Sequence, residues 1–305
     1  MGLSVWLRVS RAPFLSAAAV PVILGGALGW HRAGLFHWPH FLLTLLGALL
    51  VHAGANLINE YADHESGADP SNPVRTPFSG GSGTLEEGLL APRAVLAAAV
   101  LAFAGGSAAG LYLNAVTGGT VILVLGVLGV ALGWTYSARP LQLGYRGRGF
   151  GELAVALAFG PLIVLGSYYV QTGTLDSAAL AVSLPVTVLI ALVLIVNGFP
   201  DHDGDRAAGK RTLVVTLGRR RSMMLYQVLV AAPFALTVAF VVARLIPSAC
   251  LLALLPAPLA WKAAVTLRAH YRSAEGVLPA NAATVALHGL FGVLLAVGLV
   301  VDRVL

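Results

Sequence analysis

Charged residues are scarce in this chain. Asp, Glu, Lys and Arg make up only 10% of its 305 residues, whereas 58% of the residues are hydrophobic. A soluble domain usually carries about 25% charged residues, because it needs polar groups to cover its surface. The composition therefore excludes an ordinary soluble globule and predicts that lipid surrounds most of the chain.

Cysteine is nearly absent as well. The single residue, Cys250, cannot form an intramolecular disulfide and has no second cysteine with which to bind a metal. The net charge of +6 indicates contact with anionic lipid or an anionic substrate. No basic face or aromatic platform stands apart from the membrane loops, so nucleic acid is not an expected partner.

Long apolar runs fill most of the sequence. Nine windows have about 20 mainly apolar residues, which is enough to cross a bilayer as a helix. They cover roughly 12–30, 39–59, 92–113, 117–136, 151–171, 178–197, 223–243, 246–266 and 281–301. These runs are too long and too uniformly apolar for barrel strands. The sequence thus predicts an all-α fold, a polytopic membrane bundle of about nine transmembrane helices.

The charges predict the orientation of this bundle. If the nine spans alternate in direction, all but three of the 19 lysines and arginines lie on the side of the N-terminus. The positive-inside rule then places the N-terminus and the loops on that side in the cytoplasm, with the chain in the inner (plasma) membrane. Eleven of the 13 acidic residues lie on this side too. Since acidic residues contribute little to orientation, they call for a second explanation.

The acidic residues form two clusters, each at the end of an apolar span. The first contains Asn56, Asn59, Glu60 and Asp63, whose i, i+3, i+4, i+7 spacing places them on one helix face, followed by Gly67 and Asp69. Gly67 can turn the chain so that Asp69 returns over that face. The second cluster contains Asp201 and Asp205 at i, i+4 spacing. Both clusters are expected at the cytoplasmic end.

Converging carboxylates repel one another unless a cation lies between them. Oxygen ligands suit Mg²⁺ or Ca²⁺, but neither cluster has the twelve-residue pattern of a calcium loop. Mg²⁺ commonly binds one or two carboxylates and completes its shell with substrate phosphate. Nearby basic residues could offset the remaining phosphate charge: Arg75, Arg139, Arg146, Arg206, Lys210 and Arg211. Acids at helix ends are also often only solvated, which is our interpretation of Glu86, Glu87 and Glu275.

These residues resemble two motifs of a known family. Asn59-Glu60-Tyr61-Ala62-Asp63, with Gly67-Ala68-Asp69, resembles the first aspartate-rich motif of the UbiA-type intramembrane prenyltransferases. The run from Asp201 to Leu213 resembles the second. Gly151-Glu152-Leu153, Phe159-Gly160-Pro161 and Ser167-Tyr168-Tyr169 are most similar to the 1,4-dihydroxy-2-naphthoate polyprenyltransferase branch. Glu60 stands where the family usually has aspartate.

The resemblance covers nearly the whole chain and implies a single transmembrane prenyltransferase domain over residues 1–305. It implies transfer of a polyprenyl group from its diphosphate to an aromatic acceptor, with Mg²⁺ as cofactor. The expected metal ligands are Asn59, Glu60, Asp63, Asp69, Asp201 and Asp205. The expected diphosphate-binding residues are Asn56, Arg139, Arg206, Lys210 and Arg211, and the expected catalytic residues are Asp63, Asp201, Arg75 and Tyr136. The glycine-rich segment 80–83 is interpreted as a mobile lid over this site.

Two alternatives stay open at this point. The donor motifs are shared across the family, so the acceptor could also be 4-hydroxybenzoate, homogentisate or a tetrapyrrole; the branch motifs favour 1,4-dihydroxy-2-naphthoate and menaquinone biosynthesis. A transporter of cations or organic anions is the alternative of another class. That class favours charges near the bilayer midplane or inverted repeats. The sequence has its acids at one end of the spans and no clear internal repeat, which favours the enzyme.

Overall fold

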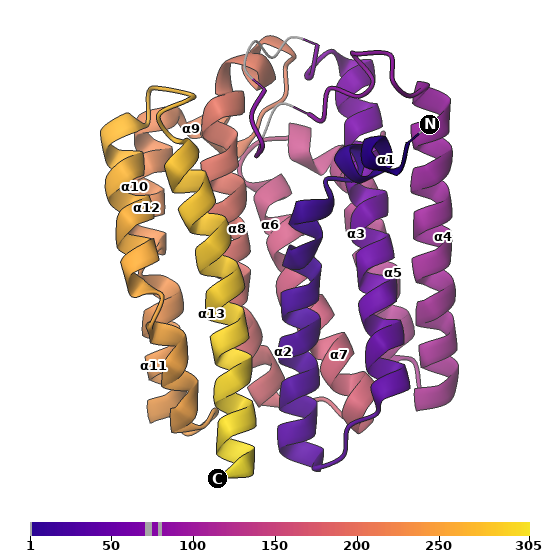
Figure 1. Cartoon of the computed structure of the whole chain (residues 1–305), viewed down its shortest axis with the longest axis vertical. Coiled ribbons are helices and arrows are strands. Elements are labelled where there is room, and N and C mark those ends of the chain that lie inside the picture. The colour runs from indigo at the N-terminus through magenta and orange to yellow at the C-terminus, as the bar shows by residue number, and fades with distance from the viewer. Residues whose placement is uncertain (1, 71–74, 79–80) are drawn as a thin grey trace.

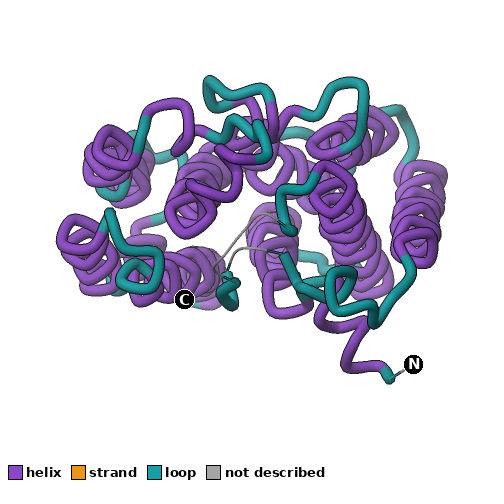
Figure 2. Tube along the Cα trace, turned by 90° about the horizontal axis from the view of Figure 1, so that it is seen from above, coloured by secondary structure: helices purple, strands orange, loops and turns teal. Residues whose placement is uncertain are grey.

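The computed structural model describes residues 2–70, 75–78 and 81–305. Within these ranges the chain is almost entirely helical, and the one extended feature is an isolated bridge between Arg146 and Arg211. The long helices stand side by side along the longest axis, and the two termini lie at opposite ends of the bundle (Figure 1). Figure 2 shows the loops that gather at the end of the bundle that carries α1 and α9. Gly80 of the expected lid lies outside the described residues.

Short helices alternate with long ones along the chain. The first part contains α1 (Leu3–Val9), η1 (Ala12–Leu15), α2 (Ser16–Ala33), α3 (Trp38–Ser66), α4 (Pro92–Thr117), α5 (Val121–Ser137) and η2 (Leu143–Tyr145). The middle part contains α6 (Phe150–Leu157), η3 (Ala158–Leu162), α7 (Ile163–Thr172), α8 (Ser177–Ala207) and α9 (Leu213–Leu217). The last part contains α10 (Arg219–Leu229), α11 (Ala232–Val242), η4 (Ser248–Leu254), α12 (Ala257–His270) and α13 (Leu278–Val304).

Each of the nine predicted windows overlaps a helical segment. Eight helical segments among the described residues are long and apolar enough to cross a membrane, and α5 is a ninth, shorter apolar helix of 17 residues. The chain is therefore a multi-pass membrane protein. The predicted all-α bundle of about nine transmembrane helices is confirmed.

Helices α3 and α8 continue well beyond the ends of their apolar windows. The windows end near residues 59 and 197, whereas α3 continues to Ser66 and α8 to Ala207. Gly67, in the left-handed conformation with φ of 80°, then ends α3. The polar side chains of these last turns bond within the protein, so neither helix needs to stop where its hydrophobicity stops. Both aspartate clusters, apart from Asp69 in the turn after α3, therefore lie on helix rather than in loops.

Prolines interrupt three of the predicted spans. Pro233 lies in the first turn of α11 and follows a break from α10, because proline supplies no N–H to the preceding turn. Pro256 lies between η4 and α12 rather than inside a continuous helix. Pro161 lies in η3, a single turn of π-helix between α6 and α7. Such π turns change which side chains face a neighbouring helix.

Small residues let the helices approach one another closely. A Cβ atom added to Gly106 of α4 would lie 2.6 Å from the Val51 side chain of α3. A Cβ atom added to Gly29 of α2 would lie 2.6 Å from the Gln171 side chain of α7. Close backbone approach of this kind drives helix association in lipid, where apolar burial alone does not. The largest buried cluster surrounds α8 and α13, and a smaller one lies between α3 and α4.

Candidate active site

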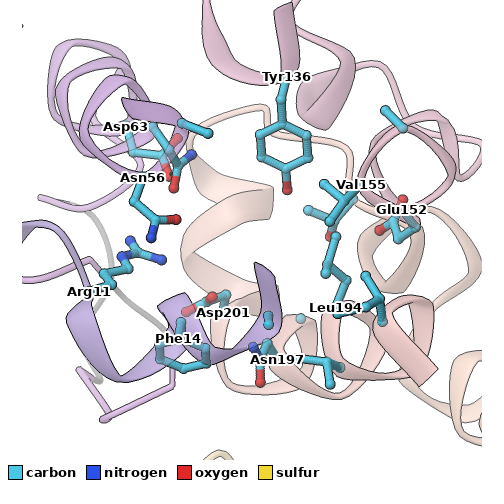
Figure 3. A pocket seen from close by; sticks show the side chains of 18 of the residues that line it. Arg11, Phe14, Asn56, Asp63, Tyr136, Glu152, Val155, Leu194, Asn197 and Asp201 are labelled. Atoms are coloured by element: carbon cyan, nitrogen blue, oxygen red, sulfur yellow. The ribbon is translucent and has the colours of Figure 1, made fainter. Parts of the chain in front are cut away.

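A cavity of about 220 Å³ is lined by the last turns of α3 and α8, at the end of the bundle where the N-terminus lies (Figure 1), and Figure 3 shows it from close by. Asn56 and Asp63 project into it from α3, opposite Tyr136 of α5 and Glu152 of α6, while Asp201 projects from α8 (Figure 3). Its charged lining, among the described residues, consists of Asp63, Asp69, Glu152, Asp201, Asp205, Arg11 and Lys210. Five carboxylates thus face two cationic side chains, which leaves an excess of negative charge.

Asp63 is the most heavily bonded carboxylate of this cavity. Its Oδ2 accepts hydrogen bonds from Lys210 Nζ at 2.8 Å and from Asn59 Nδ2 at 3.1 Å. Its Oδ1 accepts a hydrogen bond from the Tyr145 hydroxyl. Asn59 also donates to Ser137 Oγ on α5 at 3.0 Å. These bonds fix the Asp63 side chain and join α3 to α5.

Lys210 connects the two aspartate clusters. Its ammonium group lies 2.8 Å from Asp63 Oδ2 and 3.7 Å from Asp205 Oδ1. Burial lowers the pKa of Lys210, but the Asp63 and Asp205 carboxylates outweigh that effect and raise the pKa well above its ordinary value. The lysine is therefore charged at neutral pH. Its Nζ also lies 5.3 Å from the centre of the Tyr145 ring, within cation–π range.

Asp69 reaches the cavity through the turn after α3. Its backbone N–H donates to the Asp63 carbonyl at 3.3 Å, just after the left-handed Gly67. The side chain is buried, and its Oδ2 has no hydrogen-bond partner in the described part of the chain. Burial, reinforced by the Asp63 carboxylate, raises the pKa of Asp69 to about 8. A buried carboxylate oxygen without a donor is a group that a cation would stabilise.

Arg11 enters the cavity from the N-terminal segment. Its backbone is left-handed, with φ of 52°, which is uncommon for a residue with a side chain. The preceding carbonyl, Ser10 O, accepts a hydrogen bond from Asn56 Nδ2 at 3.0 Å, which holds this turn on α3. Burial lowers the pKa of Arg11, but the Glu60 and Asp69 carboxylates outweigh it, so the pKa is raised. Arg11 thus supplies a permanent positive charge near both clusters.

Eight of the predicted site residues line this one cavity. They are Asn56, Asn59, Asp63, Asp69, Tyr136, Asp201, Asp205 and Lys210. They come from α3, α5, α8 and the adjoining loops, although the outermost two, Asn56 and Lys210, are 154 positions apart in the sequence. The Tyr136 hydroxyl points into the cavity between Asp63 and Val155 (Figure 3).

Five predicted site residues lie elsewhere. Glu60 is fully buried beside the cavity, where Ser82 N–H donates to its two carboxylate oxygens at 2.9 and 3.0 Å and the Ser82 hydroxyl donates as well. Arg11 Nη2 lies 3.4 Å from Glu60 Oε2. This placement favours anchoring of the loop at Ser82 over metal binding by Glu60. Arg139, Arg206 and Arg211 are exposed outside the cavity lining.

Arg75 also lies outside the cavity lining. Its guanidinium pairs with Glu86 at 3.4 Å and with Glu87 at 4.0 Å. Glu87 also forms a two-point ion pair with Arg8 of the N-terminal helix α1. Glu87 therefore ties the segment after α3 to the N-terminal helix, and Glu86 pairs with Arg75 and with His64 of α3, so neither glutamate is merely solvated.

Four ionisable residues among the described part of the site lie outside the predicted set. The positive-inside rule already accounts for the charge of Arg11, and nothing in the sequence distinguishes Arg11 from Arg8. Tyr145 lies in a loop between two predicted spans, where tyrosine commonly serves as an interfacial anchor. Glu152, part of a branch motif, lines the cavity and accepts a hydrogen bond from Leu213 N–H at 2.8 Å. His52 lines the cavity from α3, four residues before Asn56. An ionisable residue within a membrane span usually marks a functional site, and His52 could have been identified from the sequence on that ground.

A second, larger cavity of about 730 Å³ adjoins the first. It lies between α3, α4, α5, η3 and α7, and its lining is almost wholly apolar, with glycines on several helices. Five of the described residues line both cavities: His52, Ala55, Gly133, Ala158 and Phe159. A charged group can therefore occupy the first cavity while an attached hydrocarbon chain lies in the second.

The donor set of the first cavity fits Mg²⁺. Its oxygen donors come from carboxylates and amides, the excess charge is negative, and Asp69 has an orphaned oxygen. No three Asp, Glu, His or Cys side chains among residues 2–70, 75–78 and 81–305 form a group that could hold a metal by themselves. Mg²⁺ usually takes only one or two carboxylates and completes its shell with phosphate and water. The residues therefore suit a metal that arrives with a phosphorylated substrate.

Comparison with known proteins agrees with this geometry. The model of the UbiA prenyltransferase family matches residues 18–285. The 1,4-dihydroxy-2-naphthoate octaprenyltransferase of Mycobacterium tuberculosis is 37% identical over 266 residues, or 86% of each chain. The 2-carboxy-1,4-naphthoquinone phytyltransferase of Synechocystis is 29% identical over 96% of this chain and 92% of its own.

A solved structure has the same fold. A UbiA homolog from Archaeoglobus fulgidus, bound to DMAPP and Mg²⁺, superposes with a TM-score of 0.68 at 17% identity. The match covers 96% of this chain and 99% of the homolog. The family match extends over most of the chain and includes both aspartate clusters. The protein is therefore a member of the UbiA prenyltransferase family.

Proposed function

We propose that this protein transfers a polyprenyl group from polyprenyl diphosphate to 1,4-dihydroxy-2-naphthoate, in menaquinone biosynthesis. The observation that carries the proposal is the pairing of two cavities. One holds both aspartate clusters with Arg11 and Lys210, and the adjoining one is apolar and more than three times larger. A prenyl diphosphate has the same two parts, a compact anion and a long hydrocarbon chain.

The polar cavity binds the diphosphate. Asn59, Asp63, Asp69, Asp201 and Asp205 are the residues that would hold Mg²⁺, and Glu60 holds the loop beside them. When bound, Mg²⁺ offsets the charge that develops on the departing diphosphate. Lys210 and Arg11 add two fixed positive charges from the protein, and the Tyr136 hydroxyl points into the same space. Fixed charges aimed at a developing anion stabilise a transition state without later reorganisation.

The apolar cavity binds the prenyl chain and keeps water from the reacting carbon. The allylic C–O bond breaks, and diphosphate leaves with the bonding electrons. A ring carbon of the acceptor then forms the new C–C bond, and the acceptor carboxyl group leaves as CO₂. An enclosed apolar wall protects a cationic prenyl group from hydrolysis.

The acceptor assignment rests on the curated relatives and on the branch motifs. The Mycobacterium tuberculosis relative has the name of a naphthoate prenyltransferase, and the Synechocystis relative has that of a carboxynaphthoquinone phytyltransferase. We also propose that the N-terminus and the site face the cytoplasm of the inner (plasma) membrane. The basic residues on that side of the bundle support this orientation.

Transfer is tested with the purified protein in nanodiscs. The assay supplies Mg²⁺, an octaprenyl diphosphate and 1,4-dihydroxy-2-naphthoate, and mass spectrometry detects prenylated, decarboxylated product. We expect product that disappears when EDTA removes the metal and returns when Mg²⁺ is restored. Folded protein that forms no product with any aromatic acceptor would refute the proposal.

The acceptor is tested in cells. The chain is expressed in a bacterium that lacks its naphthoate prenyltransferase, and the quinones are extracted and measured. Restored menaquinone is the expected result. Restored ubiquinone in a hydroxybenzoate-transferase mutant, without restored menaquinone, would keep the reaction class and refute the naphthoate acceptor.

A further inference from the structure

His52 stands at the junction of the two cavities. Among the described residues that line both cavities, the other four are alanine, glycine and phenylalanine, which have no polar side-chain atom. If the diphosphate lies in the polar cavity and the chain in the apolar one, the allylic carbon between them lies at this junction. An attacking ring carbon must come within about 3–3.5 Å of that carbon. The acceptor ring therefore has to bind beside the residues that the cavities share.

The position of His52 on α3 brings it into line with the aspartate cluster. Residues 52, 56, 59 and 63 are spaced i, i+4, i+7 and i+11, so they form one stripe on the helix, and all four line the polar cavity. His52 lies about 6 Å deeper along the helix axis than Asn56 and about 16 Å deeper than Asp63. The stripe thus passes from charged residues at the end of the helix to a single ionisable side chain at the junction.

The imidazole of His52 has no partner that explains its burial. Its side chain is nine-tenths buried, and Nδ1 has no hydrogen-bond partner within the described ranges. A buried polar atom in this state is destabilising unless a ligand or water bonds to it. The Phe159 ring packs edge-to-face against the imidazole, with ring centres 4.6 Å apart and planes at 79°.

The π turn η3 positions Phe159 at the junction. Pro161 cannot donate the hydrogen bond that a regular helix needs, and the extra residue of the turn displaces the preceding side chains. Gly160 lets this turn pack directly against α8, because a Cβ atom there would collide with the Thr187 hydroxyl. The backbone geometry of the turn thus holds Phe159 in place, and its ring lies beside the His52 imidazole at the junction of the two cavities.

We propose that His52 hydrogen-bonds the ring hydroxyl of the aromatic acceptor and that Phe159 packs against the acceptor ring. This inference rests on the proposed function and names the binding site of its second substrate. With its ring proton on Nε2, the neutral imidazole accepts a hydrogen bond at Nδ1 from the acceptor hydroxyl. This bond satisfies the buried atom and turns the ring toward the allylic carbon.

The first experiment compares two buried histidines. His52→Leu removes the hydrogen bond at the junction, whereas His288→Leu removes a buried histidine of α13 whose Nε2 is also unpartnered but which lines neither cavity. We expect His52→Leu to raise the KM for the naphthoate at least tenfold while the KM for the prenyl diphosphate changes less than twofold. His52→Gln keeps a hydrogen-bonding group and should recover most of the acceptor affinity. His288→Leu should leave both KM values unchanged.

The second experiment removes the hydroxyl from the substrate instead. Acceptor analogues with either ring hydroxyl replaced by a methoxy group are compared with the parent compound. The unaltered protein should discriminate against at least one analogue by tenfold or more in kcat/KM, and His52→Leu should lose most of that discrimination. If His52→Leu fails to fold, the same comparison is made with His52→Gln and His52→Asn. These two variants should retain part of the discrimination against the methoxy analogues.

Three results are decisive. An unchanged acceptor KM in folded His52→Leu, with normal transfer by the unaltered protein, would overturn this inference alone. The same would follow if the methoxy discrimination were equal in the His52→Leu variant and the unaltered protein. Absence of transfer to any aromatic acceptor by the unaltered protein would overturn the proposed function and this inference together.

Discussion

Helices α3 and α8 carry the two aspartate clusters, yet the protein surrounds them very differently. Two thirds of the most apolar stretch of α8 (67%) is buried within the protein, against 17% of the corresponding stretch of α3. Helix α8 packs within the large cluster formed with α10, α11 and α13, whereas α3 faces the apolar cavity beside α4 and α5. One half of the molecule is thus filled, and the other half contains space for a hydrocarbon chain.

This difference matches what the two parts of a prenyl diphosphate require. The diphosphate needs ligands held in fixed positions, and Asp201 and Asp205 project from the most buried helix. The prenyl chain needs an apolar space but few specific contacts, and α3, α4 and α5 line that space with glycine and aliphatic residues. The aspartates of α3 gain their rigidity from hydrogen bonds instead, since Asp63 is bonded by Asn59, Tyr145 and Lys210.

The largest effect on activity is expected from a change in α8, in the densely packed half of the molecule. Asp201→Asn removes a carboxylate that lines the cavity, and we expect kcat to fall on the order of 1,000-fold because the departing charge loses its stabilisation. Asp203→Asn is the matched control, since Asp203 is exposed and pairs with Arg219 at 3.1 Å. The control should retain activity within about twofold in the nanodisc assay. Equal losses of kcat in the two variants would show that Asp201 has no specific catalytic role and that only the overall negative charge at this end of α8 matters.

A smaller effect is expected where the N-terminal segment meets the cavity. Arg11→Gln removes one of two cationic side chains of the lining, and hydrogen bonds to charged groups contribute about 1.5–3 kcal/mol, so we expect about 30-fold weaker binding of prenyl diphosphate. Arg8→Gln breaks only the exposed ion pair with Glu87 and should change binding less than threefold. Isothermal titration with Mg²⁺ and a thiodiphosphate analogue checks both. Equal affinities for the two variants would remove Arg11 from the site.

The smallest and most selective effect on activity is expected in the half of the molecule that contains the apolar cavity. Gly126 of α5 lines the apolar cavity, and a Cβ atom there would meet no other atom within 4 Å. Gly126→Leu should fill part of that space and lower kcat/KM about tenfold for an octaprenyl donor while leaving a dimethylallyl donor unaffected. Gly289→Leu, on α13 and outside both cavities, also meets open space and should change neither value. A loss that is equal for both donors would mean that the chain lies elsewhere.

Much of this architecture follows from the sequence. The nine apolar windows predict the spans, because a lipid solvent leaves helix as the only way to bond so many backbone groups. The spacing within each cluster places Asn59 with Asp63, and Asp201 with Asp205, on one helix face. Gly67 predicts the turn that returns Asp69 to that face. These inferences depend only on local geometry, which the chain order determines.

The other parts of the site depend on contacts between distant segments. The sequence offers several arginines beside the second cluster, but only packing decides that Lys210 turns inward while Arg206 and Arg211 remain exposed. Glu60 follows the helical spacing of its neighbours, yet Ser82, on a distant loop, captures its carboxylate. Arg11 joins the cavity through a left-handed turn that no residue type at that position predicts. The spacing of residues along a helix predicts which side chains share a face. It does not predict which distant residues contact that face.

The central claim is that the diphosphate and the prenyl chain occupy the two separate cavities. An experimental structure with Mg²⁺ and a non-hydrolysable octaprenyl thiodiphosphate tests it most directly. We predict density for the diphosphate among Asp63, Asp201 and Lys210, the first prenyl unit beside His52 and Phe159, and the chain between α3, α4 and α5. A chain that left the polar cavity between α8 and α13, away from Phe159, would contradict the account.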